Sequence, residues 1–562
     1  MARGKIVGAA LSSCVHVAGI AHVLELARER GWEAVFLGPA VPVPDVVQAI
    51  RKHEPDVVAL SYRLTSGSAA AVLAELKRAL EAAGEPRRRY AFGGTPAVCE
   101  VARRLGLFEA VFDGTEGQEA VVAWLEGAGA PVPGHEWADM LLGRVEQLRP
   151  YPLLRHHFGQ PTVEATVDGA RRIAEAAVLD VLSLGPDQNA QESFFRPEEM
   201  APGESGAGGV PVRSSDDLRR IYAASRCGNY PLLRCYSGTR DLIRWAEVLL
   251  ETIHQAWAAV PLFWYSTIDG RSNRPLVEAI RENQATMAWY TARGVPVEVN
   301  DAHHWSLREA PDGVAVAAAF LAAYSAKRMG ARTYVAQYML NTPPRTSAAM
   351  DLAKMLAKRD LIWSLHDGSF SSLCQVRAGL THFGPEPNRA KGQLAASTAV
   401  GLALEPDIVH VVGFSEGDHA ATADEVIEAC EIAHGVLADL RSGRPDVTSD
   451  PLVEERRAEL REEARLILDE IRRLAGPSEA EPLASPETLA EAVRVGVLDA
   501  PHLRPSTECR GAVKTRIVKG ACVAWDDEAG RPLPEAERLA HLRAAASGAG
   551  RTRTYRRTED RP

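Results

Sequence analysis

Three short polar motifs follow predicted strands near the N-terminus of the chain. The first is Val7-Gly-Ala-Ala-Leu-Ser-Ser-Cys14-Val-His16-Val-Ala-Gly19, in which a loop holds one histidine and then a glycine. The second is Leu60-Ser61-Tyr62-Arg63-Leu64, and the third is Phe92-Gly93-Gly94-Thr95. Together they offer an imidazole, a hydroxyl group and a glycine turn. Parallel sheets bind ligands at the carboxyl ends of their strands, so the motifs predict one ligand site at a sheet edge.

The elements that must position these motifs alternate in type along the chain. Short apolar runs rich in Val, Ile, Ala and Phe cover residues 5–12, 33–37, 56–61, 89–93 and 109–113. Helical patterns cover residues 18–30, 44–53 and 68–83 between them. This alternation predicts a parallel sheet with helices on both faces. We expect an α/β domain of the doubly wound, flavodoxin-like type over residues 1–128, followed by a Gly- and Pro-rich linker over 129–159.

The three motifs resemble the cobalamin-binding domain of corrinoid mutases and methionine synthases. The resemblance implies that His16 ligates cobalt, and that Cys14 stands where the family has an aspartate bonded to the other imidazole nitrogen. A thiol is a weaker partner for that nitrogen. The resemblance also implies a cofactor pocket formed by Gly19, Ser61, Leu64, Gly93, Gly94 and Thr115. The alternative is an ordinary doubly wound domain in which His16 has no cofactor role.

Composition limits the classes of protein that remain. The chain has 562 residues, 46% of them hydrophobic and 25% charged, which is typical of globular proteins. A net charge of −10 argues against nucleic-acid binding. No apolar run reaches the ~18 residues that a membrane span requires. The eight cysteines are scattered, which favours reduced thiols and predicts a cytoplasmic location.

A second alternation of strands and helices fills the middle of the chain. Roughly eight strands separated by helical patterns predict a (β/α)8, TIM-type barrel over residues 160–445. A doubly wound sheet of the same length is the structural alternative. A small C-terminal region over 446–546 begins with a charged helix, and we expect 547–562 to be a disordered tail. The predicted strands are 180–184, 231–234, 261–265, 296–299, 332–336, 361–365, 372–376 and 407–412.

The C-terminal region carries a second resemblance. The stretch from Glu491 through Gly496-Val-Leu-Asp499-Ala-Pro501 looks like the end of the glutamate mutase catalytic subunit. With the cofactor module in front, the chain resembles a single-polypeptide glutamate mutase (methylaspartate mutase). The resemblance implies adenosylcobalamin (cobalt) as cofactor, a radical isomerisation of a small-molecule substrate, and a homodimer.

The barrel retains only part of that family's substrate site. Arg234 resembles the arginine that clamps a substrate carboxylate, and Tyr265 resembles one of a pair of tyrosines. Glu416 or Asp418 stands in place of a coenzyme-binding lysine, and these carboxylates either bind the coenzyme's ribose or cap the next helix. The family's second arginine and its amine-binding glutamate have no counterpart. Asp187 and its neighbouring amides suggest a substrate held by neutral hydrogen bonds at one end, and therefore a substrate other than glutamate.

Two adjacent histidines, His303 and His304, close another predicted strand. Neighbouring residues of a strand point to opposite sides, so we expect at most one of them to face the barrel mouth.

Three functions remain in play. The first is an adenosylcobalamin-dependent carbon-skeleton mutase. The second is a methylcobalamin-dependent methyltransferase, because such enzymes share the histidine-bearing loop. The third is a non-catalytic corrinoid carrier or sensor.

Overall fold

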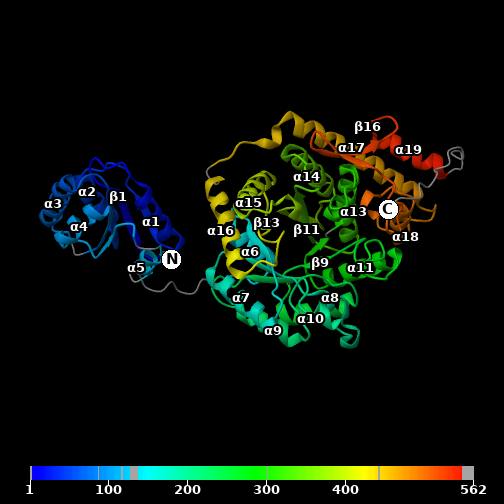
Figure 1. The fold of residues 1–562 in the computed structure, drawn as a ribbon, viewed down its shortest axis with the longest axis horizontal. Coiled ribbons are helices and arrows are strands. Elements are labelled where there is room, and N and C mark those ends of the chain that lie inside the picture. Colours follow the sequence, from blue (N-terminus) through cyan, green and yellow to red (C-terminus); the bar gives the residue numbers. More distant parts are fainter. Residues whose placement is uncertain are drawn as a thin grey trace, which may run out of the picture. The chain divides into compact units, whose positions relative to one another are not determined.

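The chain folds into two compact units, residues 1–136 and 137–562 (Figure 1). The computed structural model describes residues 3–85, 88–115, 118–126, 137–299, 301–440 and 443–546. The predicted tail over 547–562 and the predicted domain boundary at residue 128 lie outside these ranges. None of the helices in the described ranges is long and apolar enough to cross a membrane.

The first unit is a five-stranded parallel sheet in the order β2-β1-β3-β4-β5. Its strand order reverses between β1 and β3, which is where doubly wound sheets bind ligands. Apolar side chains of α1 and α5 pack on one face, and those of α2, α3 and α4 pack on the other. The predicted doubly wound domain is confirmed. Its elements are β1 (Lys5–Ala10), α1 (Ala18–Glu29), β2 (Glu33–Phe36), α2 (Val43–His53), β3 (Val57–Tyr62), α3 (Ser66–Ala83), β4 (Arg89–Gly94), α4 (Pro96–Leu105), β5 (Ala110–Phe112) and α5 (Gln118–Glu126).

The second unit contains an eight-stranded parallel sheet that curls into a nearly closed barrel, in the order β8-β7-β6-β13-β12-β11-β10-β9. Its end strands meet through Ala256 N–H to Leu233 O at 2.9 Å and Ser237 N–H to Ala259 O at 3.3 Å. The strands are β6 (Leu153–Phe158), β7 (Val181–Leu184), β8 (Leu232–Cys235), β9 (Ala258–Val260), β10 (Val297–Val299), β11 (Thr333–Leu340), β12 (Ser371–Ala378) and β13 (Ile408–His410).

Helices connect successive strands and surround the barrel (Figure 1). The predicted (β/α)8 architecture is thereby confirmed in its nearly closed form. The helices are α6 (Leu141–Leu148), α7 (Val163–Ala176), α8 (Gln188–Ser193), α9 (Ser215–Ala224), α10 (Leu242–Ile253), α11 (Leu276–Thr291), α12 (Asp301–Ser306), α13 (Asp312–Arg328), α14 (Ala348–Trp363), α15 (Pro387–Gly401) and α16 (Ala423–Leu440).

Two of the predicted strands differ from the structure. The predicted strand over 361–365 is wrong, because α14 continues to Trp363. The barrel strand that the sequence analysis did not predict is β6. It lies in the segment predicted as a linker, so the barrel begins before residue 160. Arg155 and His157 obscure the apolar pattern of β6, because the structure turns both into a polar barrel interior.

The predicted strand over 261–265 is displaced, because β9 ends at Val260. Beyond it, the Asp301 carboxylate accepts the N–H groups of Leu262 and Phe263, at 2.5 and 2.7 Å. A side chain thus takes the place of a sheet neighbour there.

The C-terminal region packs on the barrel helices. The long helix α17 (Pro451–Leu474) lies along α13 and α14, and it buries Leu460, Ala464, Ile467 and Ile471. This spacing places the apolar residues on one side of a helix whose other side carries Glu and Arg. The remaining elements are α18 (Pro486–Arg494), β14 (Thr515–Val518), β15 (Ala521–Asp526), β16 (Arg531–Pro532) and α19 (Glu535–Ala546).

The turn after α18 depends on one buried carboxylate. Asp499 is 2% exposed and accepts the N–H groups of Gly511, Ala512 and Val513 at 2.8, 2.9 and 3.0 Å. The carboxylate therefore fastens the segment that leads into β14.

We predict that Asp499→Ala destabilises the second unit by about 3 kcal/mol, because three backbone donors lose their acceptor. Calorimetry of the full chain measures this as a lower unfolding temperature for residues 137–562. Asp499→Asn keeps one acceptor oxygen and should lose less. Equal stability of Asp499→Ala and the unaltered chain would contradict the assignment.

Candidate functional site: a cofactor loop and a barrel cavity

The loop after β1 presents His16 at the carboxyl edge of the first sheet. His16 is exposed, whereas Cys14 is fully buried beneath it. The Cys14 sulfur lies 3.9 Å from His16 Nδ1 and accepts the Arg63 N–H at 3.3 Å. The thiol thus joins the first loop to the end of β3, and it faces the imidazole nitrogen Nδ1. The second nitrogen, Nε2, is left for a ligand.

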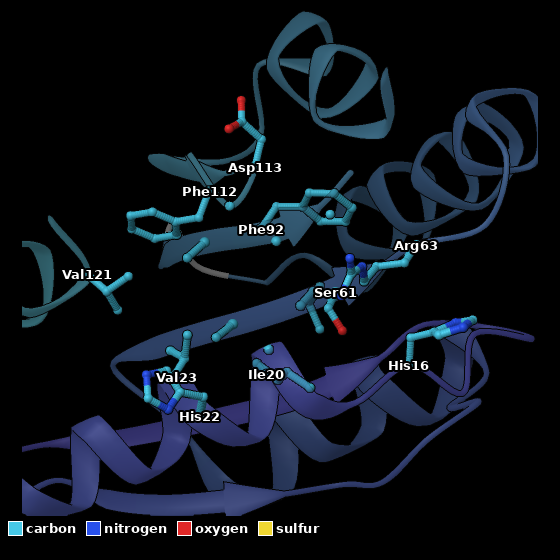
Figure 2. A pocket seen from close by; sticks show the side chains of 17 residues that line it. His16, Ile20, His22, Val23, Ser61, Arg63, Phe92, Phe112, Asp113 and Val121 are labelled. Carbon is cyan, nitrogen blue, oxygen red and sulfur yellow. The ribbon is translucent and has the colours of Figure 1, made fainter. Parts of the chain in front are cut away.

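A hollow of about 250 Å³ opens beside this loop between α1 and the ends of β3, β4 and β5. In Figure 2, Ile20 and Val23 of α1 face Phe92 and Phe112 across it, with Ser61 between them. The Ser61 hydroxyl is buried and has no hydrogen-bond partner in the described part of the chain. A buried hydroxyl without a partner is costly, so this atom fits a polar group that enters the hollow.

The two glycines after β4 have different roles. A Cβ on Gly94 would lie 2.7 Å from the Tyr62 carbonyl oxygen, so only glycine lets β3 and β4 approach here. A Cβ on Gly93 would meet only the Phe112 carbonyl oxygen, at 3.9 Å. The absence of a side chain at Gly93 therefore keeps the hollow open.

Most of the predicted cofactor residues gather around this hollow. His16, Gly19, Ser61, Gly93 and Gly94 line it. Leu64 is 37% exposed and Thr115 bonds to Asp113, and neither is part of the lining. The sequence interpretation missed His22, Arg63 and Asp113, which do line it. Arg63 directly precedes Leu64, and Asp113 lies two residues before Thr115, so closeness to predicted residues was the available signal.

The barrel interior is built around a buried carboxylate between two guanidinium groups. Glu298 lies 3.4 Å from Arg155 and 3.5 Å from Arg234, and all three side chains are at most 1% exposed. Trp257 Nε1–H also donates to Glu298, at 2.6 Å. Burial alone would raise the pKa of Glu298, but Arg234, Arg155 and these hydrogen bonds lower it below its usual range.

Above this network, the carboxyl ends of the strands enclose a cavity of about 300 Å³. Active sites of such barrels lie at this face. The lining residues come from all eight barrel strands or from the segments that directly follow them, and they are mostly polar. They are Arg155, His157, Gln191, Tyr236, Tyr265, Arg271, Glu298, His303, His304, Leu307, Gln337, Met339, Arg377, Leu380 and Glu416.

Of the predicted barrel residues, Tyr265 and Glu416 reach the cavity, and Arg234 and Asp187 do not line it. Arg234 is fully buried in the network below. Asp187 caps α8 and forms a two-pronged ion pair with Arg213, at 2.9 and 2.6 Å. These contacts satisfy Asp187 structurally and do not support its predicted catalytic role.

Glu416 does not cap the following helix. Its Oε1 accepts the Gly413 N–H at 2.8 Å and lies 3.5 Å from His156 Nε2. The N-terminus of α16 instead uses Glu425, which accepts the Thr422 N–H at 2.8 Å. Of the two roles left open for Glu416, the structure excludes the helix cap.

The expectation for the paired histidines is wrong. His303 and His304 lie on α12 and not on a strand, and both line the cavity, with ring centroids 4.5 Å apart. A helix places neighbours 100° apart, so both can reach one cavity. Burial, followed by nearby positive groups, lowers the pKa of each well below its usual range. Both imidazoles are therefore neutral near pH 7.

Tyr265 occupies a strained position at the cavity wall. Its φ is +61°, in the left-handed region that favours glycine, and its N–H donates to Asp269 at 3.3 Å. Burial and the neighbouring Tyr236 raise the pKa of Tyr265 to about 12. Its phenol is therefore protonated at neutral pH.

Arg377 is one of several cavity residues that the sequence interpretation missed. It is the penultimate residue of β12, and its Nε–H donates to the Ala378 carbonyl at 3.1 Å. Its two Nη atoms bond to no residue that the structure describes. Only the barrel register could have revealed it, because its sequence neighbours carry no motif.

The loop, the exposed imidazole and the hollow define the first unit as a cobalamin-binding domain. Residues 4–123 match the model of the B12 binding domain family. The protein is therefore a cobalamin-binding protein. Its residues fit that group, because His16 is accessible, the Ser61 hydroxyl needs a partner, and Gly93 leaves room. Among curated proteins, none matches the chain.

Solved structures show limited likeness to the chain. A novel cobalamin-binding protein from Desulfitobacterium hafniense DCB-2 is 29% identical over 23% of this chain and 60% of its own length, with a TM-score of 0.21. The cobalamin-dependent S-adenosylmethionine radical enzyme OxsB is 10% identical over 88% of this chain and 72% of its own, with a TM-score of 0.20. NtrX from Brucella abortus is 12% identical over 85% of this chain and 94% of its own, with a TM-score of 0.17. At these scores the likenesses carry no conclusion about the whole chain.

We predict that Gly93→Leu weakens cobalamin binding at least tenfold, about 1.4 kcal/mol, because the added side chain fills the hollow. The measurement is an absorbance titration of the full chain with aquacobalamin. Gly67→Leu is the matched control, since Gly67 lies on α3 outside the hollow and has open space around it. Undiminished binding by Gly93→Leu would show that the hollow is not the cofactor pocket.

Proposed function

We propose that the protein is an adenosylcobalamin-dependent carbon-skeleton mutase, resembling glutamate mutase, that acts on a small carboxylate or amino acid other than glutamate. The observation that carries the proposal is the barrel cavity, which holds Arg377 with both Nη atoms unbonded in the described structure. A guanidinium group in that state suits a substrate carboxylate. A cobalamin domain in the same chain supplies the cofactor for the reaction.

The first unit would hold the cofactor through His16, which would bind the cobalt, and through Ser61, which would contact the cofactor's own nucleotide tail. Adenosylcobalamin, when bound, supplies a carbon-centred radical by breaking its cobalt–carbon bond. The protein contributes orientation of the substrate and exclusion of water. Cys14 would orient His16 through the contact between its sulfur and the imidazole Nδ1. A thiol holds this nitrogen less tightly than a carboxylate would.

The barrel residues would bind and orient the substrate without exchanging protons. Tyr265 stays a neutral donor, because its pKa is raised to about 12. His303 and His304 stay neutral acceptors or donors, because burial lowers their pKa values. Arg377 supplies the positive charge. A site composed in this way suits a reaction in which hydrogen atoms move and protons do not.

We also propose a cytoplasmic homodimer. The eight cysteines are free, which agrees with a reducing compartment, and the glutamate mutase resemblance supports dimerisation.

The test is the paramagnetic-resonance spectrum of the full chain loaded with reduced cobalamin, compared with that of His16→Ala. We expect nitrogen splitting from a histidine ligand in the unaltered protein and its loss in His16→Ala. His53→Ala is the matched control, because it removes an imidazole of the same unit that does not line the hollow. Cobalamin that binds with its own base still attached would overturn the ligand assignment.

The second stage of the test adds adenosylcobalamin and candidate substrates. A mutase forms a radical only when its substrate is present, and the product is an isomer. Transfer of a methyl group from methylcobalamin would indicate the methyltransferase instead. Tight cofactor binding with neither reaction would indicate a carrier or sensor.

A further inference from the structure

Two charged side chains of the barrel cavity have bonding capacity that the described residues leave unused. The Arg377 Nη atoms donate no hydrogen bond to the described residues. Glu416 uses Oε1 to accept the Gly413 N–H at 2.8 Å, and its Oε2 accepts none from them. At the floor of the cavity, Arg155 and Glu298 form an ion pair with each other. Arg377 and Glu416 are thus available to a ligand.

These two side chains lie on the same side of the cavity. Arg377 pairs in register with His410, the last residue of the adjacent strand β13, and Glu416 follows six residues later. Burial lowers the pKa of Arg377, and Tyr236 and then Glu416 are the neighbours that oppose this lowering most. A neighbouring cation and anion, each with free bonding atoms, match the carboxylate and ammonium groups of an amino acid.

The opposite wall is formed by the ends of β8, β9 and β10, and its polar groups are mostly uncharged. Tyr236 and Tyr265 are phenols, and His304 is a neutral imidazole. Leu307 adds an apolar edge. The cation on this wall is Arg271, which lies 3.8 Å from Asp269 and stacks over Tyr265 at 5.0 Å.

We propose that the ligand of the barrel cavity is an amino acid with an uncharged side chain. Its carboxylate binds Arg377, its ammonium group binds Glu416 Oε2, and its side chain contacts the Tyr265 wall. This inference rests on the proposed function for the reaction, and it names the substrate class of the same site. A negatively charged side chain would meet only Arg271, whose charge Asp269 already opposes at 3.8 Å, and a positively charged one would meet no carboxylate among the residues that line that wall. Burying either charge there would therefore be costly.

The experiment is calorimetric titration of the full chain with four probes. L-leucine and L-glutamate differ in side-chain charge. The other two are 4-methylpentanoate, which lacks the ammonium group of leucine, and isopentylamine, which lacks its carboxylate. We expect leucine to bind at least tenfold more tightly than each of the other three probes.

Variants separate binding from structural effects. Arg377→Met should weaken leucine at least tenfold, and Arg377→Lys should restore part of the loss. Glu416→Gln keeps an oxygen for the Gly413 N–H, so it should weaken leucine but leave 4-methylpentanoate unchanged. A purely structural role would affect both probes alike. Arg332→Met, an exposed residue before β11, is the control.

Three outcomes would overturn the inference: tighter binding of glutamate than of leucine, no binding of leucine, or unchanged leucine affinity in Arg377→Met. Leucine binding through Arg377 and Glu416 without radical formation in the loaded protein would instead reject the mutase and leave the ligand class standing. Radical formation with a dicarboxylate would instead support the mutase and reject the proposed ligand class.

Discussion

The barrel depends on the burial of Glu298 between Arg155 and Arg234. Three charges at most 1% exposed are tolerable because they pair with one another and because Ser183, Trp257 and Gln375 add hydrogen bonds to Arg155, Arg234 and Glu298. Removing one partner of such a group typically costs ~3–5 kcal/mol. The network also fills the barrel interior beneath the cavity, so a ligand is confined to the carboxyl ends of the strands. The charges that remain for chemistry lie in the layer above.

The separation of the buried network from the cavity explains why Arg234, the arginine in the recognisable motif, is not available to a ligand. Arg234 carries the motif, yet it is buried beneath the cavity, where it shares the Glu298 carboxylate with Arg155. Arg377 carries no motif, yet its Nη atoms face the cavity without partners among the described residues. The neutral state of His303 and His304 has the same origin, because burial near other cations disfavours a further positive charge. The cavity therefore combines few free charges with many neutral donors and acceptors.

In the cobalamin domain, the main constraint is the space between the strands and in the hollow. Gly94 allows the strands β3 and β4 to approach, and Gly93 leaves the hollow empty. Cys14 ties the histidine loop to the end of β3 through the Arg63 N–H, so the thiol has a structural role besides meeting His16. An aspartate at this position would bury a carboxylate, whereas cysteine behaves as a small hydrophobic side chain and suits the fully buried site. Replacement of the carboxylate thus lowers the cost of burial while weakening the hold on the imidazole.

The sequence by itself determined the cobalamin domain, the position of His16 and the alternation that makes a barrel, because these follow from local patterns of strand, loop and helix. It misplaced β6, because the polar residues Arg155 and His157 break the apolar pattern by facing a polar interior. It also assigned His303 and His304 to a strand that the chain does not form there. Only the tertiary structure decided that Asp187 and Arg234 are engaged by charged partners and that Arg377 and Glu416 are available. The physical reason is that pairing of charges depends on partners 26 to 64 residues away in sequence, which local patterns do not encode.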